Sequence, residues 1–301
     1  MSIVYWIADG GGHKVSSALK KMMAWVRRQN DAALIVYGGD VYGSGSSDDF
    51  EEFHKQCDHD LARMCAIPGN HDWRTSTTRP GTGTIAVGFE DFWAAAPPSK
   101  ATVVRTEQSG NARYDHFKDD IPGWRLIFVD TADASEDEGA WPRNDAARTT
   151  WLAEALRGTP GRSKILFTHH SRLSCGNHGD QHNLQPLWES LFDGAAAAPL
   201  VSFTIAGHDH NISIYEPRLK TLAKAARDED GIRVLVNGAG GRGRDSPEHG
   251  TRPEKNNEHD FCVTRMQFID ANSVDVEFWS FGMGNVADPQ RLDNLTVRVR
   301  N

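Results

Sequence analysis

The chain has 301 residues, of which 39% are hydrophobic, and it carries a formal net charge of −8 at pH 7. That length is enough to bury a large core in one domain or two. The negative net charge disfavours nonspecific binding to nucleic-acid phosphates. No apolar run approaches the roughly 20 residues of a membrane helix, so we expect neither nucleic acid nor a membrane as a partner.

Short apolar runs in the first two thirds of the chain predict buried strands. They cover residues 3–8, 33–38, 64–67, 125–130, 164–168 and 201–206. Because these runs are apolar on both faces, they suit strands that are covered on both sides. Residues 15–28 show helical spacing, and residues 149–156 and 184–192 predict two further helices, the first capped by Thr149 or Thr150. This alternation predicts an α/β fold with a largely parallel inner sheet.

The pattern changes after His210. Residues 232–240, 261–269, 273–281 and 295–300 resemble strands without helices between them, which predicts a mostly antiparallel second sheet. Two polar loops, 74–85 and 239–260, interrupt the chain, and the second is long enough to be a mobile flap or a substrate-facing insertion. No segment resembles a linker, so we expect one domain over residues 1–301.

The cysteines and the first residues of the chain indicate the cellular compartment of the protein. Cys57, Cys65, Cys175 and Cys262 are scattered without a CxxC pair, which fits a reducing environment. The first residues indicate a core strand rather than a signal peptide. We therefore expect a cytoplasmic protein.

Polar side chains follow five of the predicted strands. The stretch "IPGNHDW" sets Asn70, His71 and Asp72 side by side after one strand. Ligands of open α/β sheets bind at the carboxyl ends of strands, so these polar groups are expected to converge on one site. The candidate ligands are Asp9, Asp40, Asn70, His169, His208 and His210.

The types of side chain in this set indicate a pair of metal ions. Carboxylate and amide oxygens with imidazole nitrogens, and no cysteine, suit Zn, Mn or Fe. The set holds more groups than one ion needs and about as many as two ions need. Two ions roughly 3.5–4 Å apart can bind a phosphate ester, activate a water and neutralise the charge of the transition state.

The ordered motifs D…GD…GNHD…H…GHDH resemble those of the calcineurin-like metallophosphoesterase superfamily. Within it, the chain most resembles the small purple-acid-phosphatase-like branch, also described as tartrate-resistant acid phosphatase-like. The features that carry this likeness are Asp9-Gly10-Gly11 and the loop "HHSRLSCGNHGD" at 169–180. The resemblance implies an α/β fold of four layers, α/β/β/α, with two central mixed β-sheets.

The resemblance also implies a division of the ligands between two ions. Asp9, Asp40 and His210 would hold the first ion, and Asp40 would bridge to the second. Asn70, His169 and His208 would complete the second site.

Three further residues take catalytic roles by the same resemblance. His71 would protonate the leaving-group oxygen or steady its charge, and Asp72 would orient the His71 ring. His178 resembles a second histidine on the substrate side. The nucleophile would be a hydroxide bridging the two metals.

Two features depart from the purple-acid-phosphatase pattern. The family's iron-binding tyrosine follows the second aspartate by three residues, whereas Tyr42 follows Asp40 by two, so the resemblance assigns Tyr42 no certain role. Gly11 stands where another branch has a histidine ligand, which leaves His13 as a candidate for the first ion.

Several residues near the candidate ligands have either a structural or a functional interpretation. His170 is interpreted as packing behind the ligands, and Trp73 as a wall of the pocket. Arg242 and Arg244 would either grip a phosphate or belong to a solvated flap.

The leading functional hypothesis is metal-dependent hydrolysis of small phosphate esters, with monoesters favoured. The alternatives are a phosphodiesterase of the cyclic nucleotide or glycerophosphodiester type and a metal-depleted, non-catalytic binding protein. The sequence assigns neither the metals nor the oligomeric state.

Overall fold

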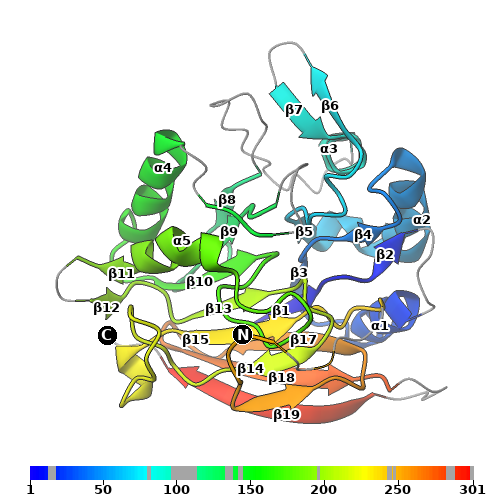
Figure 1. Ribbon diagram of the computed structural model, residues 1–301. Coiled ribbons are helices and arrows are strands. Elements are labelled where there is room, and N and C mark those ends of the chain that lie inside the picture. The colour runs from blue at the N-terminus through cyan, green and yellow to red at the C-terminus, as the bar shows by residue number, and fades with distance from the viewer. Residues whose placement is uncertain are drawn as a thin grey trace.

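Two mixed β-sheets pack face to face between outer helices in a computed structural model of the chain (Figure 1). The structure describes residues 1–12, 18–79, 83–95, 114–132, 138–141, 145–194, 197–242, 246, 249–282 and 289–298. This arrangement confirms the predicted four-layer α/β/β/α fold.

The first sheet has the strand order β19-β18-β17-β1-β3-β5. Its strands β1, β3 and β5 are parallel, and β17, β18 and β19 extend the sheet from β1 in antiparallel pairing. The bounds are β1 Ser2–Ile7, β3 Ala32–Tyr37, β5 Met64–Ala66, β17 Cys262–Phe268, β18 Ser273–Ser280 and β19 Gln290–Arg298.

The second sheet has the order β16-β14-β15-β13-β10-β9-β8. Its strands β9, β10, β13 and β15 are parallel, whereas β8, β14 and β16 pair antiparallel. The bounds are β8 His116–Lys118, β9 Trp124–Val129, β10 Ser163–Thr168, β13 Phe203–Ala206, β14 Ile212–Ile214, β15 Arg233–Asn237 and β16 Lys255–Asn257.

The prediction of a separate antiparallel sheet after His210 is therefore wrong. Strands β17 to β19 join the first sheet, and β15 joins the second sheet in parallel with β13. The sequence pattern showed antiparallel hairpins, but it carried no information about which existing strand edge would accept them.

Three clusters of buried side chains fill the three spaces between the four layers. Successive side chains of β1 point to opposite faces of the sheet, so this strand contributes to two of the three clusters. Tyr5 and Ile7 pack with the helices on the outer face, whereas Val4 and Trp6 pack between the two sheets. This is why the strand is apolar on both faces.

Helices α1 to α3 cover the first sheet, and α4 and α5 cover the second. The three predicted helices are present as α1 (Ala18–Gln29), α4 (Ala146–Arg157) and α5 (Gln185–Ser190), while α2 (Ser47–Cys57) and α3 (Val87–Ala95) were not predicted. The predicted cap of α4 was wrong: Asp145 caps this helix, accepting hydrogen bonds from the amides of Ala147 and Arg148.

The predicted polar loop at 74–85 contains a hairpin of β6 (Ser76–Arg79) and β7 (Gly83–Ala86). Four shorter strands form two further pairs: β2 (Gly11–Gly12) with β4 (Val41–Tyr42), and β11 (Phe192–Asp193) with β12 (Ala198–Pro199). Among the described helices, none combines the length and the apolar character that a membrane span requires.

Candidate metal centre and active site

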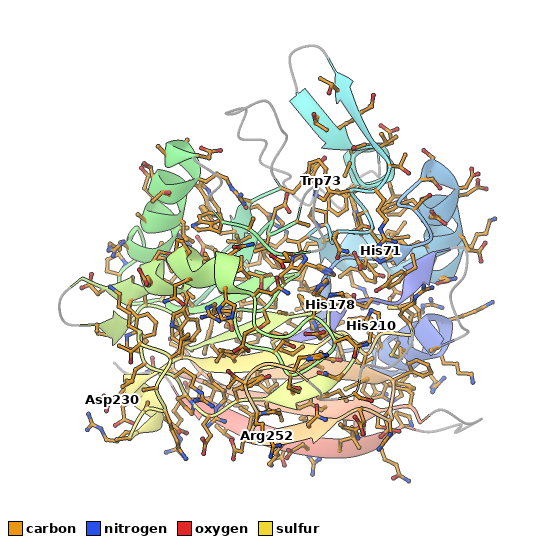
Figure 2. The ribbon with its side chains drawn as sticks, in the orientation of Figure 1. His71, Trp73, His178, His210, Asp230 and Arg252 are labelled. Carbon is orange, nitrogen blue, oxygen red and sulfur yellow. The ribbon has the colours of Figure 1, made fainter. Side chains whose placement is uncertain are left out.

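The predicted ligands follow the carboxyl ends of parallel strands in both sheets. Asp9 follows β1, Asp40 follows β3 and Asn70 follows β5 in the first sheet; His169 follows β10 and His208 follows β13 in the second. Because the two sheets are packed together, the two sets of strand ends meet at one edge. Figure 2 shows His71, His178 and His210 drawn together there, away from Asp230 and Arg252.

The backbone is strained at three of these positions. Asp9, Asp40 and His208 have φ angles of 61°, 62° and 69°. A left-handed conformation costs an L-residue roughly 1–2 kcal/mol, although Asp and His adopt it more readily than most residues. Such strain concentrates at functional sites, where it aims a side chain in a required direction.

The first group of ligands centres on Asp9 and Asp40. One ligand atom each of Asp9, Asp40 and His169 lies within 4.8 Å of the other two. His210 Nε2 lies 3.8 Å from Asp9 Oδ1. The side chains predicted for the first ion therefore lie within reach of one another, with Asp40 placed between the two predicted sites.

Tyr42 also reaches this group. Its hydroxyl lies 3.4 Å from Asp9 Oδ1 and is hydrogen-bonded to His210 Nε2. Burial, together with the charges of Asp40 and Asp9, raises the pKa of Tyr42. The one-residue offset from the family spacing therefore does not remove this phenol from the site. His13 lies outside the described residues.

The second group is built around Asn70. Its Oδ1 lies 3.2 Å from His169 Nε2 and 3.1 Å from His208 Nδ1. His169 Nε2 lies 3.5 Å from Asp40 Oδ1, which links the two groups. The predicted second-ion ligands therefore converge on a shared volume.

The donor and acceptor roles of the atoms in the second group are those expected around a bound cation. His169 Nδ1 lies 2.8 Å from the Gly38 carbonyl and donates to it, and burial lowers the pKa of His169, so its Nε2 carries a lone pair. This lone pair faces Asn70 Oδ1, which also acts as an acceptor when the amide is in this orientation. Two acceptors held 3.2 Å apart in a buried site are unfavourable until a cation or a proton lies between them. The residues present therefore fit a metal ion, and the bond to Gly38 orients the imidazole.

Glycines make room for these ligands. Gly69 lies so close to Asp40 that a Cβ there would overlap Asp40 Oδ1 and would come within 2.6 Å of His169 Cε1. Gly39 has a φ of 96°, and a Cβ on it would lie 2.7 Å from His169 Nδ1. The glycines that flank the motifs thus allow two loops and a histidine to meet.

His71 lies beside the first group, with its Nε2 4.0 Å from Asp40 Oδ2 and its side chain 14% exposed. Its Nδ1 has no hydrogen-bond partner among the described residues. The predicted contact between Asp72 and the His71 ring is therefore absent from the structure.

Asp72 binds backbone instead. Its carboxylate accepts hydrogen bonds from the amides of Gly69, Asp40 and Val41, at 2.8, 2.9 and 2.7 Å. It thereby ties the loop after β5 to the loop after β3. The side chain is buried, and both of its carboxylate oxygens accept from these amides.

His178 is exposed and lies at the opening of the site, with its ring centroid 4.0 Å from that of His208. Its amide donates to Asp209 Oδ1 at 3.0 Å, and Ser174 Oγ donates to Asp209 Oδ2. The sequence analysis overlooked Asp209, although its place between two ligands in "GHDH" was a usable signal.

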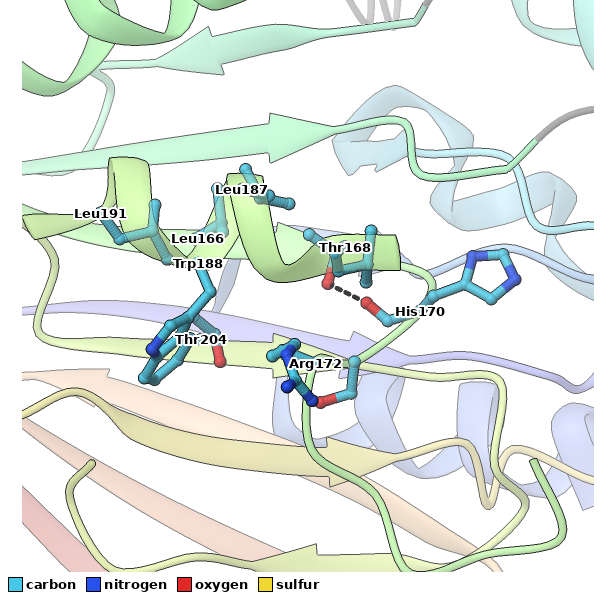
Figure 3. Close-up of a pocket in the computed structure, with 10 residues that line it drawn as sticks. Leu166, Thr168, His170, Arg172, Leu187, Trp188, Leu191 and Thr204 are labelled. Carbon is cyan, nitrogen blue, oxygen red and sulfur yellow. Dashed lines mark hydrogen bonds between the residues drawn. The ribbon is translucent and has the colours of Figure 1, made fainter. Parts of the chain in front are cut away.

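His170 lies beside the predicted ligands His169 and His208, whereas Trp73 belongs to the core. His170 offers a ligand atom within 4.8 Å of those of His169 and His208, so it is a further candidate ligand rather than packing alone. A cavity of only about 20 Å³ lies behind it, and Figure 3 shows the His170 ring directed away from Leu187 and Leu191. Trp73 is fully buried in the core near Tyr114, so its prediction as a pocket wall was wrong.

Comparisons with known proteins identify the family of this chain. The family model for calcineurin-like phosphoesterases matches residues 6–211. A probable glycerophosphodiester phosphodiesterase, GpdQ, from Arcobacter nitrofigilis is 25% identical over 182 residues, which are 60% of this chain and 57% of that protein. The chain thus matches little more than half of this relative's length.

Solved structures show the same fold. The purple acid phosphatase PPD1 of yellow lupin (Lupinus luteus) is 16% identical, with a TM-score of 0.69 over 99% of this chain and 54% of that one. PhoD is 11% identical, with a TM-score of 0.62 over 99% of this chain and 69% of that one. Because the family model matches more than half of the chain, the chain belongs to the calcineurin-like phosphoesterase family.

Proposed function

We propose that the chain hydrolyses small phosphate monoesters with two transition-metal ions, Fe, Mn or Zn. Asp9, Asp40 and His210 would hold one ion, and Asn70, His169 and His208 the other, with Asp40 shared. The proposal rests mainly on the buried acceptors Asn70 Oδ1 and His169 Nε2, which face each other at 3.2 Å beside Asp40.

Bound ions would lower the pKa of water and neutralise charge on the phosphate. The water oxygen forms a bond to phosphorus as the P–O bond to the alcohol breaks, and the proton of the water passes to solvent. His71 lies at the rim of the site, where it gives a proton to the departing alkoxide. Asp72 holds the loop that carries His71, and His178 contacts the substrate at the opening.

A metal assay and a turnover assay together test the proposal. We expect close to two ions per chain by inductively coupled plasma mass spectrometry, and hydrolysis of p-nitrophenyl phosphate. Asp40→Ala should lose both ions and turnover, whereas His71→Ala should keep the ions and lose about 10²-fold or more in kcat. His182→Ala is a matched control, because His182 is exposed and lies outside the site. No bound ions, or full turnover by Asp40→Ala, would overturn the proposal.

The likeness to a probable glycerophosphodiester phosphodiesterase favours a second candidate, hydrolysis of phosphodiesters. The same ligand set serves both reactions, and the surroundings of the metals decide which substituents fit. A higher kcat/KM for bis(p-nitrophenyl) phosphate than for p-nitrophenyl phosphate would favour the diesterase.

A further inference from the structure

A cleft of about 490 Å³ opens beside His71. Its lining comes from three parts of the chain: the loop and first turn of α2 with Ser44, Ser46 and Asp48, the loop after β5 with His71 and Arg74, and Arg242. This volume is within the range of small-molecule sites, roughly 300–1,000 Å³.

The cleft lies on the leaving-group side of the proposed reaction. His71 lines it and is the residue proposed to protonate the departing oxygen. Groups that share the cleft with His71 are therefore placed to contact the alcohol part of the substrate rather than the transferred phosphate.

Arg242 is held close to this position by two contacts. Its amide donates to the Asp9 carbonyl at 3.0 Å, and its guanidinium carbon lies 4.4 Å from the centroid of the Tyr42 ring. The Tyr42 ring in turn lies 4.4 Å from the His71 ring. The tyrosine thus places the guanidinium near the catalytic imidazole, with cation–π stabilisation.

The positive charges of the cleft lie near His71. Burial lowers the pKa of His71 and Asp40 raises it, while both Arg74 and Arg242 lower it, which places both cations within electrostatic reach of the ring.

The negative charges of the cleft belong to the start of α2. Asp49 is buried, and its carboxylate accepts from the amides and hydroxyls of Ser44 and Ser46 at 2.8 to 3.3 Å. Asp48 is exposed beside it. The carboxylate of Asp49 is therefore matched by four donors, and Arg74 and Arg242 line the same cleft.

We infer that this cleft binds an anionic group on the leaving alcohol. The preferred substrates are then phosphate esters whose alcohol carries a carboxylate or a second phosphate, because guanidinium groups bind both anions through paired N–H donors. This inference rests on the proposed function, since it takes His71 as the residue that faces the leaving group.

Three primary phosphate monoesters that differ in the charge of the alcohol test the inference on the metal-loaded protein. They are 3-phosphoglycerate with an anionic alcohol, glycerol 3-phosphate with a neutral one and choline phosphate with a cationic one. We expect kcat/KM to be roughly tenfold higher for 3-phosphoglycerate than for glycerol 3-phosphate, and lowest for choline phosphate.

Single substitutions test which side chains cause the preference for the anionic substrate. Arg242→Gln and Arg74→Gln should each lower the ratio of kcat/KM between 3-phosphoglycerate and glycerol 3-phosphate. Arg28→Gln is the matched control, because Arg28 is exposed at the end of α1 and lines no part of the cleft. The ratio in this control should equal that of the unaltered chain.

Two kinetic outcomes would overturn the inference. One is equal kcat/KM for the anionic and neutral substrates, or a preference for choline phosphate. The other is a loss in Arg242→Gln that is equal for all three substrates, since the arginine would then hold the transferred phosphate.

If no substrate is turned over, the proposed function fails and the cleft is still testable by binding. Isothermal titration calorimetry should then show tighter binding of 3-phosphoglycerate than of glycerol 3-phosphate, and a smaller difference in Arg242→Gln. Equal affinities would refute the inference separately from the activity.

Discussion

Replacing Asp72 distinguishes two ways in which this carboxylate can serve the active site. The side chain is 1% exposed, and three backbone amides, those of Gly69, Asp40 and Val41, donate to it. Asp72→Ala leaves these three donors without their acceptor. Each buried donor left unsatisfied costs roughly 1–3 kcal/mol, and removal of a buried charge beside Asp40 offsets part of this. We therefore expect a loss of about 4 kcal/mol in the free energy of unfolding.

Asp72→Asn should cost about half as much. The amide oxygen can take the place of Oδ2, which accepts from Gly69 and Asp40, but the amide nitrogen then faces the Val41 donor. One mismatched pair of donors corresponds to roughly 2 kcal/mol. Urea unfolding of the chelator-treated protein measures both values without the contribution of metal binding. Asp48→Asn, at an exposed aspartate, should change stability by less than about 0.5 kcal/mol.

A double-mutant cycle with His71→Ala completes the test. If Asp72 acts on the loops, Asp72→Ala destabilises the chain by the same amount with or without the His71 ring. The reasoning is refuted if Asp72→Ala costs less than about 1 kcal/mol in stability and its effect on kcat disappears in the His71→Ala background. Asp72 would then act through the ring, as the family resemblance implied.

Three further outcomes follow from the structure. Burial lowers the pKa of His116 to about 4, so the unfolded chain takes up a proton below its ordinary value of about 6.5 while the folded chain does not. This residue should therefore lower the free energy of unfolding by up to about 3 kcal/mol between pH 6.5 and pH 4. Urea unfolding of His116→Phe should show a correspondingly weaker dependence of stability on pH. The same pH dependence in the variant and the unaltered chain would contradict this. Gly69→Ala should lower metal content, because its Cβ would overlap Asp40 Oδ1, whereas Gly161→Ala, with nothing within 4 Å of its Cβ, should retain its metals. Adding metal at 100 times its Kd should raise the free energy of unfolding by about 2.7 kcal/mol, as measured by calorimetry, and Asp40→Ala should not respond.

The inner strands of the two sheets were predictable because strands that are buried on both faces consist of consecutive apolar residues. Residues 3–8 and 164–168 correspond to β1 and β10 within one or two residues. Helix α2 was missed because its apolar side chains are few: Phe50, Phe53 and Cys57 are buried among charged neighbours. Its helical state depends on packing against α3 and the first sheet, which a local pattern does not contain.

The predicted metal ligands came from motifs that follow strands, and the structure brings them together. The backbone contacts of Asp72 did not follow from its position beside His71, because adjacent side chains in a turn point in different directions. Trp73 was also misjudged, since a residue next to a site can equally well face the core. Arg74 carried no sequence signal that would link it to Arg242, which lies 168 positions further along the chain.

The sequence alone predicted six candidate metal ligands and their positions after strands, because motif chemistry and apolar periodicity are local properties. Tertiary structure decided that β17 to β19 extend the first sheet, that Asp72 binds backbone amides and that two arginines from distant loops share a cleft with His71. These features depend on which strands pair within each sheet and on the face-to-face packing of the two sheets. Such packing arises from contacts between residues far apart in the chain, whose pairing no single stretch of sequence encodes.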